Sequence, residues 1–583
     1  MTSTQKHFLP ITKKELDYLG WDYVDVIIVN GDAYIDHPSF GAAVIGRILE
    51  RQGLRVAILP QPNWQDDLRD FKKLGRPRLF FGVTSGNMDS MVNHYTANKR
   101  LRSDDAYTAG GIAGFRPDYA TSVYANILKQ IYPDVPVVIG GIEASMRRLS
   151  HYDYWSDTLK PSILLDSKAD VLVYGMGERP IVALAELFQK PNWREHLKDC
   201  QQVAYFDKDI SNYEKEKCIQ LHSYREELSD KRKYGEDFVL FETESNKREQ
   251  CTLIQPYDGQ YLIVRPPYPV ATEMEMDSFA LFDRMMNAPH PKYLKRGEIP
   301  AFEMIKNSIT IHRGCFGGCS FCAISAHQGK QIASRSNESI MAEVEDLIQR
   351  PYFKGHISDL GGPSANMFRM EGKDLEKCKK CPRASCLVPK ICPNLQYDHK
   401  PLIELYQKVA AQEGVKFVTI GSGIRYEMLL TDDNDKDRKN GLSQYLHQIV
   451  NKHVSGRLKV APEHTDAEVL ALMRKPGFDK FITFLDKFNR ENKKCGKNQQ
   501  LIPYLIGSHP GCTIEKMAEL SRIAHKYHLM TDQVQDFTPT PMTLSTTMYY
   551  LGYNPYDGKR VHVAKSMDER KKQHDFFFTG KKK

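Results

Sequence analysis

The sequence has no long apolar run and little net charge, and each absence excludes a class of protein. No stretch reaches the roughly 18 apolar residues that a membrane-spanning helix needs. Residues 1–22 lack the apolar segment of a signal peptide. The net charge is only +8 over 583 residues, of which 41% are hydrophobic and 26% are charged. We therefore expect a cytoplasmic, multidomain globular protein without a membrane partner.

The whole chain holds only 12 cysteines, and cysteine is scarce over most of its length. Seven of them fall between Cys315 and Cys392, and clustered cysteines in a chain without a secretory signal favour metal binding over disulfides. A first group consists of Cys315, Cys319 and Cys322. A second group consists of Cys378, Cys381, Cys386 and Cys392. The two groups mark two candidate metal sites.

Residues 1–190 alternate short apolar runs with amphipathic stretches, which is typical of a doubly wound parallel α/β sheet. The runs that predict buried strands are residues 24–29, 55–59, 79–84, 135–139 and 171–174. The stretches that predict helices are residues 40–52, 119–131 and 180–188. Glycine-containing turns follow four of the strands, at residues 30–32, 85–87, 140–143 and 175–178. Because ligands bind at the carboxyl ends of parallel strands, these turns predict a binding crevice.

Residues 301–555 show a second alternation, which predicts an incomplete (β/α)6 barrel. The strand-like runs are residues 308–312, 356–360, 416–420, 457–461, 501–506 and 533–537. Thr465 with Glu468 predicts a capping box at the start of one of the helices between them. Between the two domains, residues 191–300 are rich in charge and predict an irregular connector. Residues 556–583 predict a basic tail, which is either solvated or a nucleic-acid-binding arm.

The first cysteine group follows the first predicted barrel strand with the spacing Cys-x3-Cys-x2-Cys. Three thiolates on a short glycine-containing loop can hold three corners of a cubane cluster and leave its fourth iron open to another ligand. Structural zinc is a weaker match because it needs four ligands, and only His327 lies near the three cysteines. The loop therefore predicts an iron–sulfur cluster with an open coordination site.

This loop resembles the cluster motif of the radical S-adenosylmethionine (SAM) superfamily, including the aromatic Phe321 before the third cysteine. The resemblance implies that Cys315, Cys319 and Cys322 hold a [4Fe–4S] cluster whose open iron is chelated by SAM. It also implies one-electron cleavage of SAM to a 5′-deoxyadenosyl radical. An electron donor such as flavodoxin or ferredoxin is then an expected partner.

The same resemblance implies a SAM-binding rim at the carboxyl ends of the barrel strands. Gly361 and Gly362 look like the family's Gly-Gly-Glu segment, although a proline replaces the glutamate, so only backbone contacts carry over. Ser422 offers a hydroxyl after the third strand. Glu463 stands after the fourth strand, where several family members place a ribose contact.

Arg425 follows the third strand and two glycines, so its side chain is expected to project over the barrel mouth. SAM brings a carboxylate to that face, and a planar guanidinium can bind a carboxylate with two parallel hydrogen bonds. The alternative is that Arg425 caps a helix or pairs with Glu427 at the surface, in which case a substitution would be nearly silent.

Nearly all of the chain resembles one subgroup, the uncharacterised YgiQ-type radical SAM family. The matching stretches are residues 31–41, 140–145, 313–324 and 458–464. The N-terminal sheet looks like a cobalamin-binding domain, which makes cobalamin a candidate cofactor. Cobalamin domains that ligate cobalt through histidine use Asp-x-His-x-x-Gly, whereas Asp36 and His37 are adjacent here. The domain is therefore either a cobalamin site without a histidine ligand or a degenerate one with another role.

The second cysteine group lies in a polar insertion at residues 371–395. Four thiols within 15 residues can close a tetrahedral zinc site or hold an auxiliary iron–sulfur cluster. The alternative is a flexible loop with reduced thiols.

Hydrogen-atom abstraction by a radical SAM enzyme is the leading functional hypothesis, with a substrate that the sequence does not identify. A cobalamin-dependent methyl or methylthio transferase is the alternative within this class. A non-enzymatic iron–sulfur electron carrier would leave the open fourth iron inside a full barrel unexplained. A zinc-stabilised nucleic-acid-binding module, built from the second cysteine group and the basic tail, would leave the first cysteine group unexplained.

Overall fold

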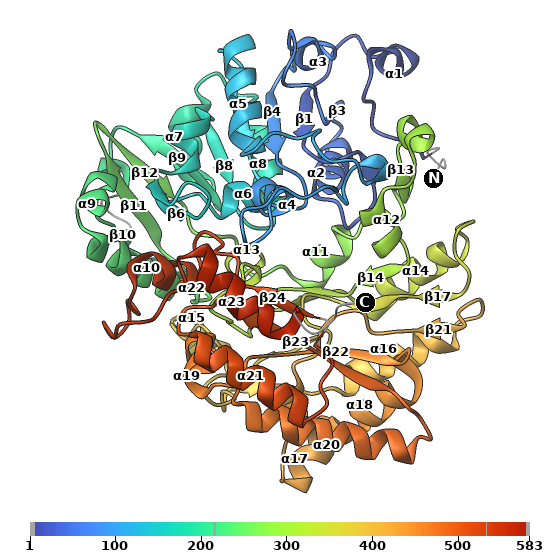
Figure 1. Cartoon of the computed structure of the whole chain (residues 1–583). Coiled ribbons are helices and arrows are strands. Elements are labelled where there is room, and N and C mark those ends of the chain that lie inside the picture. The colour runs from blue at the N-terminus through green and yellow to red at the C-terminus, as the bar shows by residue number, and fades with distance from the viewer. Residues whose placement is uncertain (1–5, 214–216, 532, 579–583) are drawn as a thin grey trace. The chain divides into compact units, whose positions relative to one another are not determined.

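The computed structural model describes residues 6–213, 217–531 and 533–578, which form two compact units. Unit 1 comprises Met1–Glu244, Glu249–Pro269 and Asp277–Lys306, and unit 2 comprises Ser245–Arg248, Val270–Met276 and Asn307–Lys583. The colours of Figure 1 run from blue to green along unit 1 and on to red along unit 2. None of the described helices is long and apolar enough to cross a membrane.

Unit 1 is built on a nine-stranded sheet with the strand order β10-β11-β12-β9-β8-β5-β4-β1-β3. Its mutually parallel strands are β1 (Val26–Asn30), β3 (Val56–Pro60), β4 (Phe80–Thr84), β5 (Val137–Ile139) and β8 (Val171–Val173). Every residue of β1 and β3 is buried, which explains why these strands are continuous apolar runs in the sequence. The predicted doubly wound parallel sheet is confirmed.

Helices that follow these parallel strands cover both faces of the sheet. They include α2 (Gly41–Arg51), α5 (Ala120–Ile131), α7 (Ile163–Ser167) and α8 (Glu178–Leu187). The helix α2 packs beside α8, and α5 packs beside α7. Because β3 and β4 flank β1, right-handed crossovers place the two helix pairs on opposite faces.

Residues 191–300 are not the irregular connector that the sequence predicts. They add β9 (Val203–Asp207), β10 (Cys218–Gln220), β11 (Thr252–Tyr257) and β12 (Gln260–Val264) to the sheet of unit 1. The strand β9 pairs antiparallel with β8, and β11 and β12 form a hairpin. The missed signal is Asp258-Gly259, a dipeptide typical of two-residue hairpin turns. The charged helix α10 (Lys231–Ser245) lies between the strands and hides their periodicity in the sequence.

Unit 2 contains an open barrel of parallel strands in sequence order. The strands are β14 (Ser308–Thr310), β17 (His356–Ile357), β18 (Asp359–Gly361), β21 (Phe417–Val418), β22 (Arg457–Glu463), β23 (Gln500–Gly507) and β24 (Val534–Asp536). The second barrel strand is interrupted at Ser358, so that β18 pairs with β14 while β17 pairs with β21. A parallel bridge from Ile424 to Val460 joins the third strand to β22, which pairs with β23 and then β24. The predicted partial barrel is confirmed.

Helices between these strands pack around the barrel. They include α14 (Asn337–Ile348), α16 (Lys400–Ala411), α18 (Leu442–Gln448), α20 (Phe478–Lys494) and α21 (Ile514–Lys526). The apolar faces of α14, α16, α18 and α20 share one hydrophobic core with the strands, whereas α21 packs in a second cluster with Leu505 and Val534. The capping box predicted at Thr465 is wrong, because α19 (Ala467–Leu472) begins one residue later. Asp466 caps it with a carboxylate that accepts from the N–H of Val469 at 3.0 Å.

The C-terminal residues belong to unit 2 and are not a solvated tail. The helix α23 (Met567–Phe578) packs on α21 and β24 (Figure 1). Arg570 and Gln573 are fully buried, and Nη2 of Arg570 donates to the backbone carbonyl that follows β24 at 2.5 Å. The basic tail predicted for residues 556–583 is therefore wrong for α23, because polar residues in its buried stripe hide the helical periodicity. Residues 579–583 lie outside the described residues.

Candidate active site

The first cysteine group lies past the carboxyl end of β14, on the loop between β15 (His312–Arg313) and α13 (Ile324–Gln328). The short strand β15 pairs antiparallel with β16 (Ala333–Ser334), so the chain leaves and returns at the same place. At Gly314 the backbone has φ +86°, and a Cβ there would lie 1.9 Å from the carbonyl oxygen of Gln331. The cysteine loop is therefore a closed turn that requires glycine at its start.

The thiols of this loop lie close enough to influence one another's ionisation. Burial raises the pKa of the Cys322 thiol to about 12, with a further contribution from the charges of Cys319 and Cys315. Burial also raises the pKa of Cys315, and Arg425 opposes that shift. Thiols in such surroundings ionise only when a cation or a metal compensates their charge. The donor set and its spacing fit an iron–sulfur cluster bound through three thiolates.

Arg425 comes from the loop after the third barrel strand and reaches the cysteine loop. Its Nη1 donates to Sγ of Cys319 at 3.3 Å. Its Nε and Nη2 both donate to Oε1 of Glu427, at 2.8 and 2.5 Å. Only 8% of Arg425 is exposed, so this ion pair is buried and not a surface pair. The predicted two-bond contact between Arg425 and the SAM carboxylate does not fit, because Glu427 occupies the side of the guanidinium that such a contact uses.

A second buried ion pair lies beside the same loop. Oε1 of Glu463 is 3.7 Å from Nζ of Lys475, and both side chains are buried. Burial raises the pKa of Glu463, and Lys475 and Arg425 oppose that shift. The cations Arg425 and Lys475 are thus each paired with a carboxylate, Glu427 and Glu463. Three thiolates at this loop would therefore need further positive charge, which a bound metal supplies.

Gly361 and Ser422 meet at the barrel rim around Asp359. The hydroxyl of Ser422 donates to Oδ2 of Asp359, and the backbone N–H before Ser422 donates to Oδ1 at 2.9 Å. A Cβ at Gly361 would lie 3.3 Å from Oγ of Ser422, and one at Gly362 would lie 2.6 Å from the ring of His312. The structure therefore brings the two predicted rim segments together. Sequence reasoning missed Asp359, although it directly precedes the Leu-Gly-Gly segment.

The helix α22 (Leu544–Leu551), which follows the barrel, also holds the cysteine loop. The N–H of Ser545 donates to the carbonyl oxygen of Ser320 at 2.9 Å, and the two hydroxyl oxygens lie 2.8 Å apart. Nε2 of His509, from the loop after β23, lies 2.6 Å from Oγ of Ser545. No sequence motif marks Ser545, whose role arises only because the fold brings it to Ser320.

The second cysteine group lies on the predicted insertion, which a small hairpin of β19 (Glu371–Gly372) and β20 (Leu395–Gln396) closes. All 12 cysteines are described, and none forms a disulfide. The N–H of Cys386 donates to the carbonyl oxygen of Phe316, within the first cysteine loop, at 3.0 Å. Cys386 and Cys392 also pack with Phe316 in one apolar cluster. The two cysteine groups are therefore in contact within unit 2.

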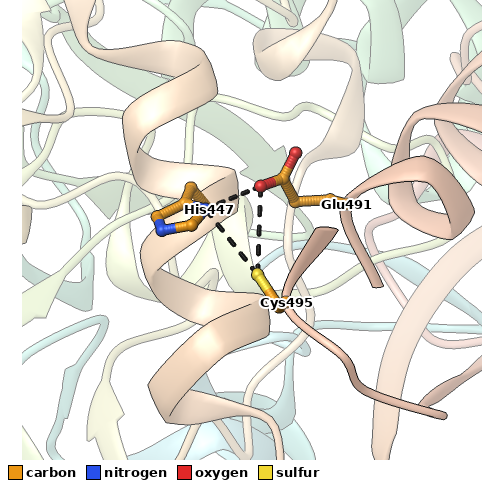
Figure 2. A group of neighbouring side chains, drawn as sticks. All are labelled: His447, Glu491 and Cys495. Atoms are coloured by element: carbon orange, nitrogen blue, oxygen red, sulfur yellow. Dashed lines mark hydrogen bonds and ion pairs between the residues drawn. The ribbon is translucent and has the colours of Figure 1, made fainter. Parts of the chain in front are cut away.

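A third group of donor atoms lies on the helices α18 and α20. Figure 2 shows His447 and Glu491 facing one another, with Cys495 beside them. Nδ1 of His447 is 2.6 Å from Oε1 of Glu491 and 3.7 Å from Sγ of Cys495. Among the described residues, these are the only His, Cys, Asp and Glu side chains that bring three donor atoms within 4.8 Å of one another. Glu491 also pairs with Lys494 at 3.3 Å, so the group is a partly exposed ion-pair network.

Two of the loops at the carboxyl ends of the parallel strands in unit 1, those after β1 and β4, pack against each other. A Cβ at Gly31 would lie 2.1 Å from the carbonyl oxygen of Ser85, and one at Gly86 would lie 2.0 Å from Oδ1 of Asp32. Asp32 is buried, and its Oδ1 is 2.9 Å from Nη1 of Arg116. Burial raises the pKa of Asp32 to about 6, although Arg116 opposes the shift. These two glycine turns therefore pack together around a buried ion pair, where the sequence predicts an open crevice.

The residues that would mark a histidine-ligated cobalamin have partners within the protein. Nδ1 of His37 accepts a hydrogen bond from the N–H of Ser39 at 3.1 Å. The neighbouring Asp36 is buried and accepts from Nε of Arg47 at 3.1 Å. A metal-ligating histidine is ordinarily oriented by a carboxylate on its other nitrogen, and here Arg47 holds that carboxylate. These residues do not fit a cobalamin with a histidine ligand.

The partial barrel and its cysteine loop define the class of a radical SAM protein. A family model described as Radical SAM N-terminal matches residues 8–308, and one described as a domain of unknown function (DUF3362) matches residues 532–577. The chain is 53% identical over 584 residues to a UPF0313 protein of Bacteroides thetaiotaomicron, covering 98% of this chain and 94% of that protein. It is 46% identical over 565 residues to a UPF0313 protein of Methanocella arvoryzae, covering 96% and 91%. The chain belongs to the UPF0313 family of radical SAM proteins, and the predicted resemblance is confirmed.

Two solved structures align with the chain at low identity. The radical SAM methyltransferase TsrM from Kitasatospora setae, with tryptophan substrate and a SAM analog bound, is 13% identical with a TM-score of 0.47, covering 89% of this chain and 75% of that chain. The cobalamin-dependent SAM radical enzyme OxsB, with aqua-cobalamin bound, is 10% identical with a TM-score of 0.48, covering 96% and 56%. By its family, the present chain is a radical SAM enzyme whose cofactors are a [4Fe–4S] cluster and SAM.

Proposed function

We propose that Cys315, Cys319 and Cys322 hold the [4Fe–4S] cluster and that the enzyme abstracts a hydrogen atom from its substrate. The observation that carries the proposal is the place of the three thiols past the first barrel strand, with Nη1 of Arg425 on the sulfur of Cys319. When bound and reduced by one electron, the cluster and SAM supply a 5′-deoxyadenosyl radical. The electron comes from a one-electron carrier protein such as flavodoxin or ferredoxin.

In this proposal, Arg425 and Lys475 set the electrostatics of the cluster site. A hydrogen bond from Arg425 to the sulfur of Cys319 stabilises negative charge on that sulfur and so favours the reduced state. Glu427 and Glu463 hold the two cations in place through ion pairs of 2.5 and 3.7 Å. Because these charges are fixed before reduction, little reorganisation accompanies the arrival of an electron. None of the four side chains ligates a metal, and Arg425, Lys475 and Glu427 are positioning residues.

The rim around Asp359 is the proposed binding place of SAM. The backbone of Gly361 and Gly362 allows close approach, and the carboxylate of Asp359 suits the ammonium group of SAM. Ser422 orients that carboxylate through its hydroxyl. Glu463, whose charge contributes to the raised pKa of Cys322 and which therefore lies near the cluster loop, is the proposed ribose contact.

A cobalamin-dependent methyl or methylthio transfer is the second candidate function. The parallel strands of unit 1 follow the order β3-β1-β4-β5-β8, and sheets of this order bind ligands at the switch point beside β1. That switch point holds the buried pair of Asp32 and Arg116, so a cobalamin there requires these loops to open. Hydrogen abstraction without cobalamin needs no such rearrangement and is the leading candidate. The nucleic-acid-binding hypothesis loses one of its supports, because α23 is packed on the barrel.

Anaerobic reconstitution of the full chain, followed by incubation with SAM and dithionite, tests the proposal. We expect 5′-deoxyadenosine as a product and a change in the EPR spectrum of the reduced cluster when SAM is added. A variant that combines Cys315→Ala, Cys319→Ala and Cys322→Ala should lose about four irons per chain and all SAM cleavage. Formation of S-adenosylhomocysteine only when cobalamin is supplied would favour the transferase instead. A cluster spectrum that does not respond to SAM would indicate an electron carrier.

A further inference from the structure

The four thiols of the insertion converge on one another. The N–H of Cys381 donates to the carbonyl oxygen of Cys378 at 3.3 Å, and the N–H of Cys392 donates to that of Cys386 at 2.7 Å. Nδ2 of Asn394 donates to Sγ of Cys378 at 3.4 Å, and the N–H of the next residue, Leu395, donates to the carbonyl oxygen of Cys392 at 2.9 Å, so the two turns lie together. Two turns of the chain therefore bring all four sulfurs into one neighbourhood.

The surroundings of Cys378 have the features of a sulfur that ligates a metal. A Cβ at Gly372 would lie 2.6 Å from Sγ of Cys378, so only glycine allows the hairpin to approach this sulfur. Nδ2 of Asn394 donates to the same Sγ at 3.4 Å. Oδ1 of Asn394 in turn accepts from the N–H of Asp374 at 3.0 Å, which fixes the amide. Donors held in this way orient metal-bound sulfurs and tune their charge.

Lys330 supplies an independent observation that points to negative charge at this place. Only 6% of the residue is exposed, and its ammonium donates to the carbonyl oxygen of Arg383. Within the described part of the chain, no carboxylate forms an ion pair with it. Arg383 stands between Cys381 and Cys386 in the chain, so this hydrogen bond holds the buried ammonium against the segment that carries the second cysteine group. A buried ammonium without a counterion is costly, and metal-bound thiolates would supply that counterion.

The insertion is also built against the first cysteine loop. At Gly318 the backbone has φ +61°, and a Cβ there would lie 2.2 Å from the carbonyl oxygen of Ala384. The N–H of Cys386 donates to the carbonyl oxygen of Phe316 at 3.0 Å. The first cysteine loop and the insertion are therefore joined by a hydrogen bond and by a close contact at Gly318.

We propose that Cys378, Cys381, Cys386 and Cys392 ligate a second iron–sulfur cluster, of the [4Fe–4S] class, packed against the loop of the first cysteine group. The choice of a cluster over zinc follows from the spacing of the sulfurs. A tetrahedral zinc ion with Zn–S bonds of about 2.3 Å draws its sulfurs to within about 4 Å of one another. In the described structure no three of these four sulfurs lie within 4.8 Å of one another. A cubane cluster holds its cysteine sulfurs farther apart than a single zinc ion does. The site does not depend on the proposed function of the first cysteine group.

Metal analysis of the full chain after anaerobic reconstitution tests this site. We expect about eight irons per chain in the wild type and about four in a variant with Cys381→Ala and Cys386→Ala. The variant with Cys218→Ala and Cys495→Ala, which removes two thiols outside both groups, should keep the wild-type iron content. The remaining cluster of the Cys381→Ala, Cys386→Ala variant should still change its EPR spectrum with SAM, which shows that unit 2 is folded.

Two outcomes would overturn the second cluster while leaving the proposed function standing. One is about four irons per chain in the wild type together with about one zinc ion that the Cys381→Ala, Cys386→Ala variant loses. The other is a wild type with about four irons and no zinc, which would mean that the insertion binds no metal. If the assignment of the first cluster were wrong, the variant with Cys315→Ala, Cys319→Ala and Cys322→Ala would instead keep the wild-type iron content.

Lys330→Gln gives a readout that does not depend on losing the metal. The substitution removes a positive charge beside the proposed cluster but no ligand, so iron content should stay at the wild-type level. Because positive charge stabilises a reduced cluster, the midpoint potential of the second cluster should become more negative. Lys354→Gln, on the exposed surface of unit 2, is the matched control and should leave both potentials unchanged. An unchanged potential in Lys330→Gln would contradict a cluster at this place.

Discussion

Nη1 of Arg425 donates to Sγ of Cys319 at 3.3 Å, although 106 positions separate the two residues in the chain. The other side of the guanidinium is held by Glu427, so the direction of this hydrogen bond is fixed. The third barrel strand thus delivers a buried positive charge to the cysteine loop that follows the first strand. In the proposed function, this contact lets Arg425 tune the sulfur of Cys319.

Replacing Arg425 should affect stability and redox behaviour separately. In Arg425→Met, Glu427 loses its main partner, and we expect the free energy of unfolding to fall by about 3 kcal/mol. The cluster potential should also become more negative, because the sulfur of Cys319 loses a charged donor. Adding Glu427→Gln removes the buried unpaired charge and should restore most of the stability without restoring the potential. Thermal unfolding and redox titration measure the two effects, and a potential that recovers along with stability would mean that Arg425 acts only through folding.

Gly318→Ala should disturb the contact between the two cysteine loops. The new methyl group would meet the carbonyl oxygen of Ala384 at 2.2 Å, in a left-handed backbone conformation that disfavours alanine. We expect a loss of stability of about 2 kcal/mol and a lower iron content after reconstitution. Gly423→Ala is the matched control, because no atom lies within 4 Å of its Cβ position. Equal melting temperatures and iron contents in the two variants would refute the close packing of the loops.

Asp32 should make the stability of unit 1 depend on pH. Its pKa rises from 3.8 to about 6 on folding because the carboxyl is buried. The folded state therefore binds the proton more tightly, so this contribution is complete below pH 3.8 and is lost as the pH rises through about 6. The stability of the wild type relative to Asp32→Asn should fall by about 3 kcal/mol between these limits. Urea unfolding of both proteins from pH 4 to 7 measures the difference, and the opposite slope would show that Arg116 governs the ionisation.

Any cobalamin that the chain binds should lack a histidine ligand. The ring of His37 accepts from its own backbone through Nδ1, and Asp36 is paired with Arg47. The EPR spectrum of the protein with cob(II)alamin should therefore show no nitrogen splitting from a protein imidazole. Such a splitting in the wild type that disappears in His37→Ala would contradict the structure.

The helix α23 should contribute to the stability of unit 2. Oε1 of Gln573 accepts from the N–H of Ser508 at 2.8 Å, and its Nε2 donates to the carbonyl oxygen of Cys512 at 3.1 Å. Gln573→Ala leaves both buried backbone groups without these partners, which should cost about 2 kcal/mol. The exposed pair Lys571→Ala and Lys572→Ala is the control and should change the melting temperature little. If α23 were a solvated tail, Gln573→Ala and the lysine variant would have the same melting temperature.

Local patterns in the amino-acid sequence were enough to predict the class of the protein and the order of the elements within its two predicted α/β regions. The spacing of Cys315, Cys319 and Cys322 is a local property, and so is the apolar periodicity of buried strands such as β1 and β22. Such signals survive in the linear sequence because neighbours along the chain create them. The signals failed where polar residues are buried, as with Arg570 and Gln573 in α23. They also failed where a charged helix separates the strands β10 and β11.

The packing of distant segments determines which side chains meet at the site. The contact of Arg425 with Cys319 and the contact of Ser545 with Ser320 depend on how distant segments pack, and their sequence spacing carries no trace of it. The same holds for Lys330, whose buried ammonium faces the second cysteine group only because the insertion folds back on the first loop. Contacts of this kind depend on the packing of the whole barrel, because the position of a buried charged side chain depends on all the elements that surround it.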